Sequence, residues 1–261
     1  MNRTLRIIWV LAFVLIGSLS AGTLKGMSLN GSTGLVSIPS GRIGWEKSTD
    51  FGFDVGYHTI MADENIHIPK VSISLFKMAE LGFAYDTQDD PDNADMIMHG
   101  KLQLPIKGTS AVSFGGNVQF LKQKGMEDQT ISQLYLACTY PGEFFNMPAE
   151  TTAVIGKRFG ENAPDDAIDF GMGFDLNLFP DTFQGYIHWI NDFSNFSYQQ
   201  QAVYGANANS RGVFNTGIRI DFASIPKFSK YKFAVDAIIT DALDSNRAFC
   251  LGIAFGAPLG N

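Results

Sequence analysis

The stretch DFGFDVGYH, residues 50–58, changes character at every position. Aromatic and aliphatic side chains share one face of the extended chain: Phe51, Phe53, Val55 and Tyr57. Glycine and polar side chains share the other face: Gly52, Asp54, Gly56 and His58. Successive side chains of a β-strand point to opposite sides, so a strand between lipid and a polar interior alternates in this way. The stretch therefore predicts a membrane-spanning β-strand.

A second stretch, DFGMGFDLNL at residues 169–178, repeats the alternation. A helix has a period of 3.6 residues and does not divide its side chains between two faces in this manner. Weaker copies predict further strands near 71–77, 80–87, 96–106, 110–121, 130–140, 151–159, 183–193, 213–222, 231–239 and 248–256. Together they predict an all-β fold, an antiparallel transmembrane β-barrel of about 12 strands within a range of roughly 10–14.

The links between the predicted strands alternate in length, as expected for outer-membrane barrels with long outward loops and short periplasmic turns. The predicted outward links are 59–70, 88–95, 122–129, 160–166, 194–212 and 240–247. The opposite links are mostly shorter and lie near 78–79, 107–109, 141–150, 180–182 and 223–230. The 141–150 link, PGEFFNMPAE, is long for a periplasmic turn. This phase places the chain in the outer membrane of a double-membraned bacterium.

The first residues predict export. Arg3 and Arg6 precede an apolar run at 7–16, and small residues follow it up to Gly22. That order is typical of a secretory signal peptide, and ten apolar residues are too few for a membrane-spanning helix. We therefore divide the chain into a signal peptide at 1–20, with cleavage as late as residue 22, a lead-in segment at 21–49 and a barrel at 50–261.

Composition agrees with a membrane barrel and narrows the partners. Charged residues make up only 17% of the chain, against roughly 25% in soluble domains. The net charge of −7 argues against nucleic acid as a partner. We expect contacts with outer-membrane lipids and with the barrel assembly machinery. Cys138 and Cys250 fall on opposite faces of the predicted wall, so we expect two unpaired thiols.

A motif precedes the first long strand. Residues 30–42 read NGSTGLVSIPSGR. Taken alone, this segment predicts a short edge strand that Pro39 ends, followed by a turn in which Gly41 supplies flexibility before Arg42. The segment also resembles the start of the YjbH-like outer-membrane proteins, a barrel family associated with exopolysaccharide production. The positions that carry this resemblance are Gly34, Leu35, Ile38, Pro39, Ser40, Gly41 and Arg42. The resemblance implies envelope polysaccharide or its export components as partners.

No stretch of the sequence predicts catalysis. A barrel hydrolase of the Ser-His type needs a histidine beside its partners. The four histidines, His58, His67, His99 and His188, lie in no sequence that resembles a barrel lipase, protease or palmitoyltransferase signature. We therefore expect no catalytic residue, no cofactor, no metal site and no enzymatic activity.

The predicted interior face carries charges of both signs. The candidate lumen-lining residues are Asp54, His58, Asp86, Lys101, Lys157, Asp169, Asp175, Arg219, Asp221, Lys232 and Asp236. Two interpretations remain open at this point. The charges either pair and close the lumen, or they line a narrow aqueous path. Because six of them are acidic, such a path favours cations and neutral polar solutes.

The leading functional hypothesis is an outer-membrane barrel that supports envelope or exopolysaccharide traffic, as a narrow passage or as a structural partner. The polysaccharide is inferred from the family resemblance, and the barrel is inferred from the alternation of side chains. The alternatives are a general small-solute porin, an outer-membrane enzyme, which the histidines disfavour, and a secreted soluble β-protein.

The membrane assignment predicts a simple behaviour in cell fractions. We expect the mature chain in the outer-membrane fraction, with a gel mobility that shifts on boiling because a closed barrel resists detergent until heated. A soluble periplasmic location without a heat-modifiable band would contradict the assignment.

Overall fold

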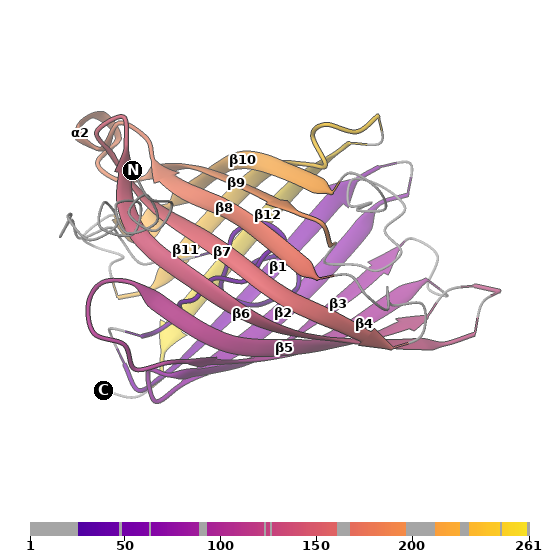
Figure 1. Cartoon of the computed structure of the whole chain (residues 1–261). Helices are drawn as coiled ribbons and strands as arrows, with labels where there is room; N and C mark the ends of the chain where they lie inside the picture. Colours follow the sequence, from indigo (N-terminus) through magenta and orange to yellow (C-terminus); the bar gives the residue numbers. More distant parts are fainter. Residues whose placement is uncertain are drawn as a thin grey trace, which may run out of the picture.

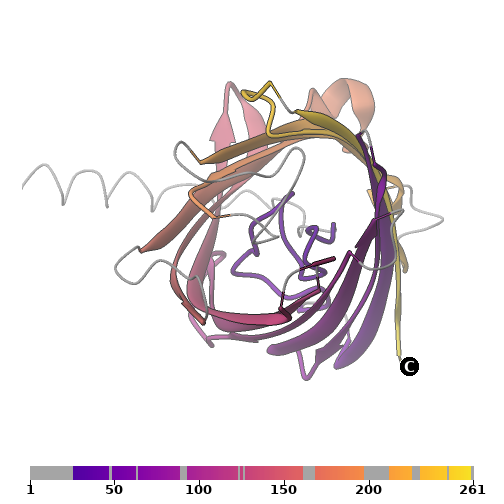
Figure 2. The same cartoon turned by 90° about the vertical axis from the view of Figure 1, so that its right-hand side faces the viewer.

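The chain forms a closed antiparallel barrel of twelve strands (Figures 1 and 2). The computed structural model describes residues 26–46, 49–62, 64–88, 93–122, 124–125, 127–160, 168–196, 212–224, 230–245 and 247–259. Each strand pairs with its sequence neighbours, and β1 closes the ring against β12, with Gly52 opposite Pro258. The predicted fold and strand number are confirmed. The expected signal peptide lies outside the described residues.

Each predicted strand overlaps one observed strand. The strands are β1 (Phe51–Met61), β2 (Ile66–Leu75), β3 (Ala79–Gln88), β4 (Ala94–Gln103), β5 (Ala111–Lys122), β6 (Gln129–Phe144), β7 (Met147–Gly160), β8 (Asp169–Asn177), β9 (Ile187–Ser194), β10 (Val213–Asp221), β11 (Lys232–Thr240) and β12 (Ala248–Pro258). The strand predicted from residue 183 begins later, because Pro180–Phe183 forms the short helix α2. A 3₁₀ turn, η1 (Phe222–Ser224), follows β10. None of the helices in the described ranges is long and apolar enough to cross a membrane.

The prediction of a long link at 141–150 is wrong. The ladder between β6 and β7 continues to the pair Phe144 and Met147, so only Phe145 and Asn146 form the turn. Both have positive φ, at 52° and 61°, which suits a tight hairpin. The pairing of β6 with β5 ends at Thr139. The two prolines of the stretch therefore lie where the hairpin extends past its neighbours, and an edge tolerates a missing N–H.

The wall has an apolar outer face and a polar inner face. Met172 and Ile253 are exposed on the outside, as are other large apolar residues along the strands, whereas Gly173 is buried. Cys138 is half-buried, Cys250 is buried, and both are free thiols. An apolar band around a closed barrel is the surface that lipid requires. The protein is therefore an outer-membrane barrel.

Residues 26–46, called here the inner segment, lie inside the barrel. Figure 2 shows this indigo stretch surrounded by the ring of strands. Residues 26–45 are all buried, and Glu46 is half-buried. Within the inner segment, the β-bridges are isolated ones, between Met27 and Thr33 and between Gly34 and Pro39. Other backbone hydrogen bonds close its turns, such as the one from the Leu29 N–H to the Val36 carbonyl at 2.7 Å. The expected edge strand ending at Pro39 is therefore wrong.

Gly41 also has a different role from the one expected. A Cβ at this position would lie 2.4 Å from the carbonyl oxygen of Ala111 and 2.9 Å from the backbone nitrogen of Thr139. Its own N–H donates to the Thr139 hydroxyl at 2.9 Å. Gly41 lets the inner segment approach the backbone of the wall, since any larger residue would collide there.

The apolar outer face predicts that the cost of an added cation depends on its depth in the membrane. Met172→Arg near the middle of β8 should destabilise the barrel by about 2–4 kcal/mol, because it places a cation in the apolar part of the bilayer. Phe179→Arg at the nearby rim should cost roughly 0–1 kcal/mol. Urea unfolding in phospholipid vesicles, followed by tryptophan fluorescence, measures both. Equal costs at the two sites would contradict the assigned lipid face.

Candidate functional site

The best candidate site is the lumen, where carboxylates of the wall hold the inner segment. Asp192 on β9 accepts hydrogen bonds from three consecutive backbone N–H groups through one oxygen. The donors are Val36 at 2.9 Å, Ser37 at 2.7 Å and Ile38 at 3.1 Å. Its other oxygen accepts from the Ser37 hydroxyl at 3.1 Å and from the Asn215 amide at 2.7 Å. Asp192 therefore fixes the turn at 36–38 by charge-assisted hydrogen bonds.

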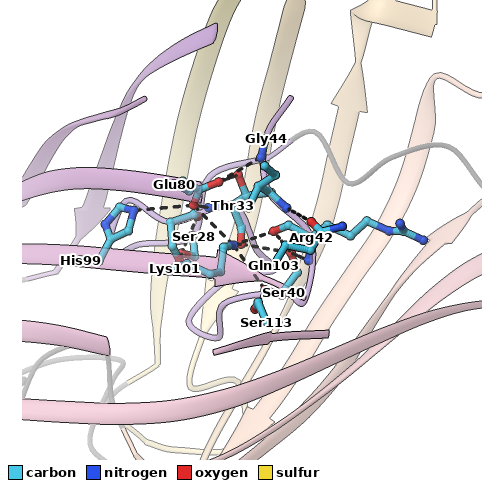
Figure 3. A network of polar contacts seen from close by, with 12 residues as sticks. Ser28, Thr33, Ser40, Arg42, Gly44, Glu80, His99, Lys101, Gln103 and Ser113 are labelled. Atoms are coloured by element: carbon cyan, nitrogen blue, oxygen red, sulfur yellow. Dashed lines mark hydrogen bonds and ion pairs between the residues drawn. The ribbon is translucent and has the colours of Figure 1, made fainter. Parts of the chain in front are cut away.

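Glu80 on β3 holds the inner segment at two further points (Figure 3). It accepts from the Thr33 N–H at 2.8 Å and from the Thr33 hydroxyl at 2.6 Å. It also accepts from the Gly44 N–H at 2.9 Å. Lys101 Nζ lies 3.4 Å from the same carboxylate. One buried acid thus connects both halves of the inner segment to the wall.

Lysines of the wall bind the carbonyl groups of the inner segment. Lys101 Nζ donates to the carbonyl oxygens of Thr33 at 3.0 Å, Ser40 at 3.3 Å and Arg42 at 2.6 Å. Lys70 Nζ donates to the carbonyl of Ser28 at 2.7 Å. Acids of the wall accept from backbone N–H groups of the inner segment, and lysines of the wall donate to its carbonyl groups. These backbone groups are therefore satisfied by side chains and not by a neighbouring strand.

Ion pairs and a ring contact complete the anchorage near the end of the inner segment. Arg42 lies 2.9 Å from Glu150 and 2.8 Å from Glu46. The Trp45 Nε1–H donates to Asp54 at 3.1 Å. Lys232 lies 3.0 Å from Asp54 and 4.6 Å from the centre of the Trp45 ring. These contacts fix the chain just before β1 begins.

All positions that carry the family resemblance lie within the inner segment and are buried. Leu35 and Ile38 pack against Tyr135, Ala137 and Val154 of the wall. The motif therefore belongs to a stretch that lies inside the barrel. Nothing in the motif sequence itself reveals this location, because Gly, Pro and Ser occur in turns of every kind.

Most of the candidate lumen-lining residues are buried on the inner face. These are Asp54, His58, Asp86, Lys101, Asp169, Asp175, Arg219, Asp221, Lys232 and Asp236. Arg219 donates to Asp236 through Nε at 2.7 Å and Nη2 at 2.9 Å. His58 Nε2 lies 3.3 Å from the same carboxylate. This bidentate pair fixes a charged group in the wall beside the inner segment.

Lys157 is the exception. It is exposed and pairs across the ladder with Leu134, which is also exposed on the outer face. The next residue, Arg158, faces inward and binds Asp169 at 2.8 Å. Lys157 lies close to the end of β7 at Gly160, where a long side chain can cover apolar surface and keep its charge at the polar rim. The prediction that placed Lys157 in the lumen is wrong.

Several charged groups of the inner face are not among the candidates predicted from the sequence, including the two acids that hold the inner segment, Glu80 and Asp192. Both occupy buried positions of the alternating pattern, so that pattern contained the necessary signal. Ten acidic side chains of the strands are buried: Asp54, Glu80, Asp86, Asp95, Glu150, Asp169, Asp175, Asp192, Asp221 and Asp236. Five cationic side chains face them: Lys70, Lys101, Arg158, Arg219 and Lys232. The described inner wall is therefore acidic.

The inner segment does not balance this charge. Its described charged residues are Arg42 and Glu46, which are of opposite sign. What it offers the acidic wall is a set of backbone N–H and hydroxyl donors. In the described part of the chain, no group of three or more His, Cys, Asp or Glu side chains is arranged to hold a metal ion.

Comparison with solved structures identifies similar barrels. The NanC porin matches with a TM-score of 0.52 at 10% identity, covering 79% of this chain and 100% of that one. The KdgM porin matches with a TM-score of 0.51 at 7% identity, covering 79% of this chain and 99% of that one, also in its complex with disordered oligogalacturonate. No protein-family model and no curated protein matches the sequence. The likeness shows that the fold is that of outer-membrane porins.

The Asp192 contacts predict a local response to mutation. Asp192→Asn replaces a charged acceptor by a neutral one and should weaken the hold on the 36–38 turn by about 1–2 kcal/mol, because hydrogen bonds to charged groups are the stronger kind. Hydrogen exchange should then accelerate at the amides of Val36, Ser37 and Ile38.

Asp95→Asn is the matched control, since Asp95 accepts from Gln119 at 2.9 Å. It should leave those three amides unchanged. Identical exchange in the two variants would refute the anchoring role of Asp192.

Proposed function

We propose that this protein supports envelope or exopolysaccharide traffic at the outer membrane as a gated narrow passage, which the inner segment closes. The observation that carries the proposal is the way in which the inner segment is held. Its described contacts with the wall are hydrogen bonds and ion pairs of side chains, together with apolar packing, and no ladder joins it to a strand. It is therefore separable from the barrel in a way that a strand is not.

The wall supports this proposal because its own backbone pairing is complete. Each of the twelve strands has two neighbours, so the ring has no open edge whether the lumen is filled or empty. A barrel that only had to be solid could be filled with apolar side chains at lower desolvation cost than buried charges. A charged inner wall is suited to contact with water once the inner segment moves.

The resemblance to YjbH-like proteins is the reason for proposing exopolysaccharide as the polymer that is transported. Its matching positions lie within the segment that closes the lumen, so the resemblance and the proposed gate concern the same residues. On this proposal the partners are envelope polysaccharide or its export components, and the protein has no catalytic role.

Two other roles make different predictions. A general small-solute porin, the role suggested by the names of the similar structures, conducts without any change to the inner segment. A structural partner of the envelope never conducts. The KdgM complex contains an acidic oligosaccharide, whereas the wall of this chain carries more acids than bases, so its solute need not be the same.

Planar-bilayer conductance of the full chain distinguishes these roles. The opened variant, Thr33→Pro with Ser37→Pro, removes one backbone donor and one hydroxyl from each of Glu80 and Asp192 and leaves the wall intact. Each charge-assisted hydrogen bond contributes about 1.5–3 kcal/mol, so the open fraction should rise at least about tenfold. We expect the unaltered protein to be largely closed.

The control, Thr33→Ala with Ser37→Ala, removes only the hydroxyls and should open less. Steady conductance that is equal in all three proteins would assign a general porin. Silence in all three, with normal heat-modifiable bands, would assign a structural role.

A further inference from the structure

The acids that hold the inner segment are matched to donors of a particular kind. Asp192 and Glu80 take backbone N–H groups and hydroxyl groups of Ser37 and Thr33. Neither acid is balanced by a cation of the inner segment. When the inner segment leaves, Glu80 keeps Lys101 at 3.4 Å and Asp192 keeps the Asn215 amide at 2.7 Å. The acceptor positions that the inner segment vacates are then open to water or to the donors of a ligand. A chain of sugar hydroxyl or amino groups offers such donors.

A second, independent observation indicates that the lumen has more hydrogen-bonding capacity than the inner segment uses. The hydroxyls of Ser72, Ser74 and Tyr135 are buried and have no hydrogen-bond partner in the described part of the chain. Ser74 Oγ lies 3.2 Å from the point where a Cβ on Gly44 would stand. Buried hydroxyls are normally satisfied. These groups are therefore available to a ligand or to water in the lumen.

The surroundings of Gly44 join the two observations at one place. Its N–H donates to Glu80 at 2.9 Å. A Cβ there would lie 2.7 Å from Asp54 Oδ2 and 2.6 Å from Lys232 Nζ, next to the unpartnered Ser74 hydroxyl. Two carboxylates, an ammonium and a free hydroxyl thus converge on a position that only a glycine of the inner segment fills.

The charge of the wall restricts what can enter. Ten buried strand carboxylates face five cationic side chains, and departure of the inner segment removes one charge of each sign among its described residues. A narrow lumen with excess negative charge concentrates cations and repels anions. The excess of acidic groups on the inner wall therefore disfavours a polyanionic glycan.

We infer that Glu80, the Ser74 hydroxyl opposite it in the β2–β3 ladder and Asp192 are ligand-binding groups of the opened lumen, and that they take a glycan with hydroxyl or amino donors and no negative charge. In the closed state the inner segment occupies the two carboxylates with donors of the same chemistry. The inference rests on the proposed function and adds its substrate class.

The test uses the full-length opened variant, Thr33→Pro with Ser37→Pro, in planar bilayers. Reversal potentials in a potassium chloride gradient should show cation preference. Three oligosaccharide probes of matched length are then added: chitosan oligosaccharides, maltooligosaccharides and an acidic uronate oligosaccharide. We expect current block in that order of strength, with no block by the uronate.

Site variants in the same opened background locate the block. Glu80→Gln with Asp192→Asn should weaken the chitosan block at least about tenfold, the loss expected when charged acceptors become neutral. Ser74→Ala should weaken the block by maltooligosaccharides. Glu143→Gln, on the exposed part of the β6–β7 hairpin, should change neither.

The outcomes separate this inference from the proposed function. Equal or stronger block by the uronate, or a block that survives Glu80→Gln with Asp192→Asn, overturns the inference and leaves the passage in place. An opened variant that conducts no ions under any condition ends both the passage and the binding site. Cation preference with a block that depends on Glu80 and Asp192 supports the inference.

Discussion

The hydrogen bonds that Glu80 and Asp192 accept from backbone N–H groups determine the path of the inner segment. A buried carboxylate without donors costs several kcal/mol, so the chain inside the barrel must bring N–H groups to these two places. Their positions follow from the wall, where Glu80 stands opposite Lys101 and Asp192 opposite Asn215 in the strand ladders. Strand register thus sets the shape of a segment that belongs to no strand.

Because the ring of strands is closed, the wall and the inner segment are held by different kinds of contact. Because β1 pairs with β12, the sheet has no free edge to which the preceding residues can add. The inner segment therefore folds into the lumen, where its polar backbone is satisfied by lysines and acids of the strands. The wall is held by a continuous backbone ladder, while the filling is held by discrete side-chain contacts. A barrier made in this way can be altered at single residues without disturbing the barrel.

Alternation along the sequence was sufficient for the barrel, for the strand number and for the separation of Cys138 from Cys250, because the two-residue period of a strand is a local property. The same alternation also indicates that Glu80 and Asp192 point inward, although neither was among the predicted lumen-lining residues. The prediction for Lys157 was wrong because it gave more weight to the charge of the side chain than to its position in the alternating pattern. The 141–150 stretch was misjudged because its prolines suggested a link, whereas the extended hairpin leaves an edge on which prolines are tolerated.

The sequence by itself determined that this chain is a membrane barrel with a polar, predominantly acidic interior. Only the tertiary structure decided that residues 26–46 occupy that interior. The contacts that hold them join Thr33 to Glu80 and Ser37 to Asp192, pairs far apart in the chain that come together only after the sheet has curved and closed. No periodicity in a stretch of Gly, Ser and Pro records such contacts, because they depend on the register of strands that the stretch does not join.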